Sequence, residues 1–130
     1  MKNQFQVGDS KSFTHVVGES DLAEFESGKV HDVYATFALG RDAEWACRLF
    51  VLEMKEEHEE GIGTFLTVEH ISPALLGSTV TFEATVESIE KNEIICSYIA
   101  RVNDRTIARG RQGQKIVKRD KLERLFKSMK

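Results

Sequence analysis

The sequence predicts an α+β fold in which a mainly antiparallel five-stranded sheet wraps around one long helix. A long apolar segment with helical spacing is followed by segments that alternate with a period of two, which is typical of half-buried strands. Short connections join these strands and favour antiparallel neighbours. Because a single apolar helix covers only one face of a sheet, we expect the sheet to curl around it.

The N-terminal part contains two weak elements before the helix. Phe13–Val17 is a short predicted strand, and the Gly18–Asp21 segment is turn-like. We interpret Asp21–Ser27 as one short helical turn. This part therefore supplies the first of the five strands.

The long helix begins near Phe37 and ends in an acidic turn before Gly61. Apolar residues recur there at spacings of three and four, which predicts a largely buried helix. The recurring residues are Leu39, Ala43, Ala46, Cys47, Phe50 and Met54, and the apolar arc is widened by Trp45, Leu49 and Val51. We expect Cys47 and Cys96 to be reduced core residues rather than a disulfide.

Four strands and a charged helix follow. Pro73 ends the first of these strands, Gly77 turns the chain, and Asn103–Asp104 forms a tight hairpin. The predicted elements are the strands Thr64–Ile71, Val80–Val86, Ile94–Val102 and Arg105–Val117 and the terminal helix Asp120–Met129. Such a sheet leaves long unpaired edges, which predicts a homodimer, with a tetramer as the alternative.

Length, composition and charge exclude several classes of protein. The chain of 130 residues is 41 % hydrophobic and 30 % charged, which suits a single domain spanning residues 1–130. The net charge of −3 argues against nucleic-acid binding, because phosphate recognition needs a basic footprint. No apolar run suits a membrane span or a signal peptide, so we expect a cytoplasmic protein without a membrane partner.

No motif for a metal or a phosphate loop is present. The histidines at positions 15, 31, 58 and 70 do not have the spacing of two ligands on one turn or loop. The Gly61-Ile62-Gly63 stretch lacks the lysine and the preceding strand of a phosphate loop, and we interpret it as a helix stop and strand entry. We therefore expect no metal and no bound cofactor.

Three polar residues occupy positions that otherwise look buried: Thr36 at the helix start, Glu44 two turns into the helix, and His70 in a strand. Each has an ordinary structural explanation. Thr36 would cap the helix, and Glu44 would pair with Arg41 or Arg48 on a solvated face. His70 would be a satisfied histidine at a strand end. Taken singly, these residues do not define a site.

The order of the motifs, however, resembles a known family. The chain reads AT, EWAC, GIGT, VEHISP and VTFE between Val33 and Val117. This succession resembles the hot-dog-fold thioesterases and, within them, the fluoroacetyl-CoA thioesterase-like group. The resemblance implies an acyl-CoA thioesterase that works as a dimer with its active sites between the subunits. A non-catalytic acyl-CoA-binding or sensing module on the same fold is the alternative.

The resemblance also implies site residues. Thr36, Glu44 and His70 fall on the family's threonine, glutamate and histidine, and Gly63 matches a glycine near the thioester carbonyl. Glu44 would act as base or orienter, His70 as proton relay, and Thr36 as nucleophile or holder of a water. The backbone N–H of Gly63 would stabilise the oxyanion.

Two further features concern the substrate. Arg109, Arg111 and Lys115 are candidates for binding the phosphates of coenzyme A, unless they only protect a sheet edge from aggregation. The family's lid phenylalanine has no equivalent shortly before the threonine. Fluoroacetyl-CoA is therefore not the expected substrate unless Phe25 or Phe37 takes that place.

The helix imposes a geometric condition on this site. In a continuous helix from Thr36, Glu44 would lie about 12 Å further along the axis, too far to share one carbonyl group. Either Gly40 delays the helix start, or a second chain supplies part of the site.

Overall fold

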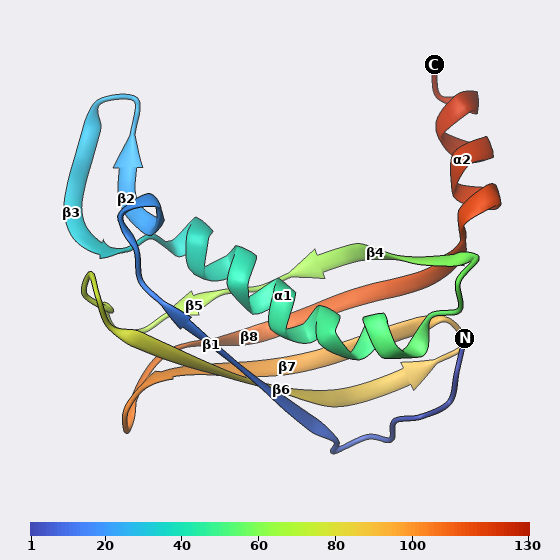
Figure 1. Ribbon diagram of the computed structural model, residues 1–130, viewed down its shortest axis with the longest axis horizontal. Helices are drawn as coiled ribbons and strands as arrows, with labels where there is room; N and C mark the ends of the chain where they lie inside the picture. Colours follow the sequence, from blue (N-terminus) through green and yellow to red (C-terminus); the bar gives the residue numbers. More distant parts are fainter.

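The computed structural model covers residues 1–130 and contains an antiparallel sheet curled around a long helix (Figure 1). Its elements are β1 (Ser10–Val16), the short 3₁₀ helix η1 (Glu19–Asp21), β2 (Leu22–Phe25), β3 (Gly28–Tyr34), α1 (Thr36–Met54), β4 (Glu59–Leu66), β5 (Glu69–His70), β6 (Thr79–Glu90), β7 (Glu93–Val102), β8 (Arg105–Lys118) and α2 (Arg119–Ser128). The sheet order is β1-β6-β7-β8-β4, and β5 also pairs with β8. The predicted five-stranded sheet with a central and a C-terminal helix is confirmed.

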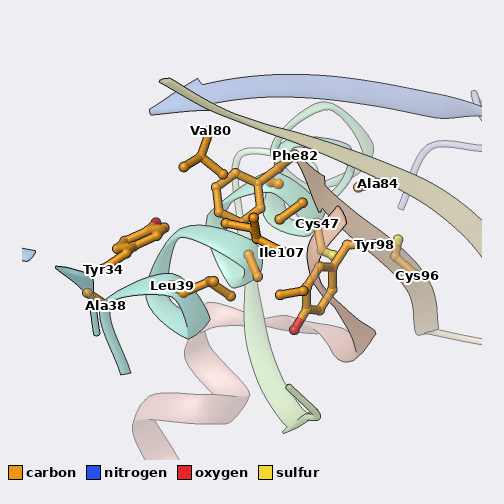
Figure 2. Close-up of a cluster of buried hydrophobic side chains, with 14 of the residues drawn as sticks. Tyr34, Ala38, Leu39, Cys47, Val80, Phe82, Ala84, Cys96, Tyr98 and Ile107 are labelled. Carbon is orange, nitrogen blue, oxygen red and sulfur yellow. The ribbon is translucent and has the colours of Figure 1, made fainter. Parts of the chain in front are cut away.

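The core lies between α1 and the concave face of the sheet. β6 up to Val86 and β7 up to Ala100 alternate between buried and more exposed residues, so that every second side chain there points to the helix. Figure 2 shows Cys47 of α1 among side chains of the sheet that include Phe82 and Tyr98. Cys47 and Cys96 are buried and free, as expected. A hydrogen bond with Cys96, together with burial, raises the pKa of Cys47, so this thiol is inert.

The outer side of α1 is more exposed than the apolar pattern predicts. Trp45 is 42 % exposed and Phe37 58 %, whereas the predicted helix buries its aromatic residues. The neighbouring edge strand β4 also carries half-exposed apolar residues, Ile62 and Leu66. We call this set, together with Leu52, the α1–β4 face. It lies beside a sheet edge that has no partner within the chain.

Two sequence-based boundaries before α1 and inside the sheet are wrong. The predicted helical turn Asp21–Ser27 is instead the end of η1, strand β2 and a two-residue turn, after which Gly28, with a φ of +109°, begins β3 of the hairpin. The predicted strand Thr64–Ile71 is two strands, because the chain is interrupted between Leu66 and Glu69. These changes add a hairpin next to the start of α1 (Figure 1).

The interruption between β4 and β5 has an identifiable cause on the adjacent strands. The Tyr98 hydroxyl donates a hydrogen bond of 2.7 Å to the backbone oxygen of Thr67. On β8, a Cβ added to Gly110 would lie 2.0 Å from the same oxygen. The absent side chain at position 110 therefore lets the chain dip towards the sheet and bring His70 close to α1.

The C-terminal helix α2 projects from the end of β8 and buries none of its residues (Figure 1). The Gly61–Gly63 stretch lies inside β4, since α1 already ends at Met54, so its predicted role as a helix stop is wrong. Neither helix combines the length and the apolar character needed to cross a membrane.

Candidate active site

Thr36 and His70 come from distant parts of the chain and meet at the start of α1. Thr36 is the first residue of α1, and His70 ends β5. The Thr36 Oγ1 atom lies 2.9 Å from His70 Nδ1. The residue before the helix is Ala35, and no side chain caps the helix, so the capping explanation for Thr36 is wrong. The hydroxyl is engaged by the histidine instead.

The imidazole of His70 is held in an environment that favours its neutral form. Burial lowers the pKa of His70 below its ordinary value, so the ring is uncharged near pH 7. Its Nε2 atom is buried and has no hydrogen-bond partner. A shallow pocket is lined by Thr36, His70 and the following Ile71-Ser72-Pro73 segment. The explanation of His70 as a fully satisfied strand-end histidine is therefore wrong.

Glu44 and Gly63 form a second group further along α1. Glu44 is half-buried, and its Oε2 atom accepts a hydrogen bond of 3.3 Å from Gln112 Nε2. A Cβ added to Gly63 would lie 3.2 Å from the same carboxylate oxygen, so the two residues face each other closely. Glu44 makes no ion pair with Arg41 or Arg48, so the explanation as a solvated helix ion pair is wrong.

One chain therefore contains two half-sites. The hydroxyl half consists of Thr36 and His70, and the carboxylate half of Glu44 and Gly63. The helix is continuous from Thr36, and Gly40 is buried within it, so the delayed helix start is excluded. Eight helical residues separate the two halves by about 12 Å along the axis. Within one chain, the two halves are therefore too far apart to act on one carbonyl group.

Comparison with known proteins identifies the family. Residues 17–120 match the family model for the fluoroacetyl-CoA-specific thioesterase. The chain belongs to this family. Membership makes it a thioester hydrolase, which confirms the enzyme class expected from the motifs. No match is found among proteins whose functions are curated.

Solved structures agree with this family assignment. A hypothetical protein of Thermus thermophilus, a member of the thioesterase superfamily, is 34 % identical, with 95 % of this chain and 92 % of that chain covered and a TM-score of 0.90. The fluoroacetyl-CoA thioesterase itself is 22 % identical, with 98 % and 99 % covered and a TM-score of 0.88. A hot-dog-like protein from Thermanaerovibrio acidaminovorans is 24 % identical, with 96 % and 93 % covered and a TM-score of 0.87. The last two likenesses show a shared hot-dog fold.

In this thioesterase, two of the basic residues named as phosphate ligands already have acidic partners. Arg109 lies 3.2 Å from Glu69, and Arg111 lies 2.7 Å from Glu87. Both arginines line one depression on the sheet next to β5. Lys115 is exposed further along β8. Binding of phosphates by the arginines would have to compete with these surface ion pairs, each of which is weak.

A polar network around two buried aspartates, which the sequence did not reveal, lies next to the hydroxyl half. His15 Nε2 is 2.7 Å from Asp21 Oδ2, and Arg41 Nη2 is 2.8 Å from Asp21 Oδ1 and 3.0 Å from Asp42 Oδ2. The Tyr34 hydroxyl donates to Asp42. Ligand atoms of His15, Asp21 and Asp42 lie within 4.8 Å of one another, but both carboxylates already form ion pairs with the Arg41 guanidinium.

The network fixes the position of the helix start. Although burial alone would raise it, hydrogen bonds from Arg41, the Gly18 N–H and His15 hold the pKa of Asp21 at about 2. The backbone oxygen of Asp21 accepts a 2.8 Å hydrogen bond from the Ala35 N–H, the residue before Thr36. The carboxylate network therefore anchors β1, the β2–β3 hairpin and the catalytic threonine candidate to each other.

Proposed function

We propose that this thioesterase hydrolyses a small or medium acyl-CoA thioester to the free acid and coenzyme A, as a homodimer whose two sites each combine residues of both chains. The observation that carries the proposal is the 2.9 Å contact between Thr36 Oγ1 and the half-buried His70 imidazole. A neutral histidine bonded to a hydroxyl at a pocket wall is an arrangement that activates a nucleophile.

The two half-sites supply complementary chemistry. In the hydroxyl half, His70 accepts the proton from Thr36 when Oγ1 attacks the carbonyl, or Thr36 holds the water that attacks. In the carboxylate half, Glu44 orients and deprotonates water, and the Gly63 N–H stabilises the oxyanion. In the first route His70 passes the proton of Thr36 to the departing thiolate of coenzyme A, and the proton that Glu44 takes from water returns to Thr36 Oγ1 when the acyl ester is cleaved. In the second route the proton that Glu44 takes from water passes to the thiolate. The proposed chemistry uses side chains and water alone.

The free edge of the sheet supports the dimer. β4 is unpaired on one side, and the adjoining α1–β4 face exposes apolar side chains. Antiparallel pairing of two β4 strands about a twofold axis would bury this face and place the two α1 helices side by side in opposite directions. If the twofold axis passes near the first turns of α1, the start of one helix approaches the second turn of the other. This arrangement joins Thr36 of one chain to Glu44 of its partner, which no single chain achieves.

Two aromatic residues suggest how the acyl group is limited. Phe25 of β2 and Phe37 of α1 lie edge to face, with ring centroids 6.4 Å apart, and Phe37 directly follows Thr36. Such a pair beside the nucleophile would cover a short acyl chain, as the family's lid phenylalanine would. A solved relative is described as a complex with fluoroacetate and CoA, which is consistent with a small acyl group here.

Release of free thiol from acyl-CoA esters of increasing chain length tests the proposal. Glu44→Ala and His70→Ala are expected to lower kcat about 100-fold or more, because each removes a group that acts on the reacting atoms. Glu57→Ala and His58→Ala are matched controls on the exposed turn after α1 and are expected to retain activity. Tight binding of acyl-CoA without turnover by the unaltered protein would contradict the proposal.

Thr36→Ala combined with mass measurement separates the two roles of the hydroxyl. An acyl group retained on the unaltered protein, and absent from Thr36→Ala, identifies Thr36 as the nucleophile. If Thr36→Ala loses activity but rapidly quenched samples of the unaltered protein contain no acylated chain, Thr36 instead holds the attacking water.

A further inference from the structure

The side of β4 that faces α1 carries two glycines, and side chains of α1, two of them charged, occupy the space that they leave. A Cβ at Gly61 would lie 2.5 Å from Val51 Cγ1 and 3.3 Å from Arg48 Nη1. At Gly63, the corresponding contact is the Glu44 carboxylate at 3.2 Å. Larger residues at either position would displace these neighbours. The two glycines therefore allow α1 to place Arg48 and Glu44 between itself and the sheet.

Two glutamines of β8 connect these two charged residues. Gln112 and Gln114 are 1 % and 2 % exposed, which is unusual for amide side chains. Arg48 Nη1 lies 3.5 Å from Gln114 Oε1, and Gln114 Nε2 donates to Gln112 Oε1 at 3.0 Å. Gln112 Nε2 in turn donates to Glu44 Oε2 at 3.3 Å. These hydrogen bonds form a row from Arg48 to Glu44, in which each group donates to the next one in the direction of the carboxylate.

The chemistry of the two ends fixes the direction of the row. A guanidinium has only donors, so Gln114 must present its oxygen to Arg48 and its NH₂ group to Gln112. Gln112 then has only its NH₂ group left for Glu44. An ionised carboxylate has only acceptors and therefore matches this NH₂ group. Arg48 is also held in place by the backbone oxygen of Gly61 at 3.3 Å.

We propose that Gln112 and Gln114, oriented by Arg48, are positioning residues for the reaction: they hold the Glu44 carboxylate in place beside Gly63. This inference rests on the proposed function, in which Glu44 acts on the substrate or on water. One oxygen of Glu44 is occupied by Gln112, and the other is left for the reaction. The amides transmit the orientation set by Arg48 without placing a positive charge against Glu44.

A double-mutant cycle in kcat tests the inference. Gln112→Met removes the donor and keeps most of the volume. It is expected to lower kcat about 10- to 100-fold, the loss that corresponds to one hydrogen bond to a charged group, with little change in KM. In a Glu44→Gln background, the same substitution is expected to lower kcat several-fold less, because the amide oxygen that replaces the carboxylate is a weaker, neutral acceptor. Gln4→Met, on the exposed N-terminal segment, is the matched control.

Three outcomes are informative. Equal losses from Gln112→Met in both backgrounds would overturn the inference, since a general packing defect acts regardless of Glu44. If the Glu44→Gln protein turns over too slowly to measure, the same cycle is measured with urea unfolding midpoints. A larger shift of the midpoint by Gln112→Met when Glu44 is present than when it is replaced then supports coupling between Gln112 and Glu44. Absence of turnover in the unaltered protein would instead overturn the proposed function, and the unfolding cycle then decides whether Gln112 is coupled to Glu44.

Discussion

Replacing Asp21 with asparagine is expected to remove a pH-dependent part of the stability. The hydrogen bonds from Arg41, Gly18 and His15 outweigh the burial of this carboxylate and bring its pKa from 3.8 to about 2. A depression of this size corresponds to about 2 kcal/mol of unfolding free energy. Because the folded-state pKa is the lower one, this contribution is complete above pH 4 and is lost as the pH falls towards 2.

Urea unfolding followed by the fluorescence of Trp45, the single tryptophan, measures this contribution. The gap in unfolding free energy between the unaltered protein and Asp21→Asn is expected to be about 2 kcal/mol from pH 5 to 7 and to narrow below pH 4. Glu24→Gln, on the exposed part of β2, is the control and is expected to show no such gap. A gap for Asp21→Asn that stays constant down to pH 2.5 would refute the reasoning, because it would not depend on ionisation.

Three further predictions concern the sheet and the substrate. Gly110→Ala is expected to lower the free energy of unfolding in urea by more than about 2 kcal/mol, because its Cβ would lie 2.0 Å from a backbone oxygen. Gly18→Ala is the control and is expected to be tolerated, because the nearest atom to its Cβ would be 3.7 Å away. Phe25→Ala is expected to raise kcat/KM for hexanoyl-CoA relative to acetyl-CoA, and an unchanged ratio would contradict a lid role. Glu87→Gln is expected to lower KM for acyl-CoA about 2-fold by freeing Arg111 for phosphate, whereas a higher KM would exclude that role.

The long helix and the long strands were predictable because their signals are local. The spacing of Leu39, Ala43 and Phe50 on α1, and the alternation along β6, follow directly from burial of one face. β2 was missed because it is only four residues long and its pairing with β3 shifts register twice, which removes the alternation. The break between β4 and β5 depends on Tyr98 and Gly110 of other strands, and no local pattern reports it.

In the candidate site, too, local motifs were predictable from the sequence, whereas contacts between distant segments were not. The motif order predicted the candidate residues, and the structure places Thr36 against His70 and Glu44 against Gly63. The buried Asp42 gave no sequence signal, since its partners come from other elements. The hydrogen bond to Glu44 could not be predicted either, because its donor, Gln112 of β8, is 68 residues away in the sequence. Tertiary contacts, rather than spacing, decide how these groups are oriented.

The central claim is that each active site combines the hydroxyl half of one chain with the carboxylate half of its partner. Thiol release by mixed dimers of Thr36→Ala and Glu44→Ala, each inactive alone, tests it most directly. Half of the dimers in an equal mixture contain both chains, and each of these has one intact site, so the mixture is expected to recover about a quarter of the unaltered activity. Thr36→Ala mixed with His70→Ala is expected to recover none, because both changes affect the hydroxyl half. Absence of recovery in the first mixture, with mixed dimers verified by mass, would contradict the shared site.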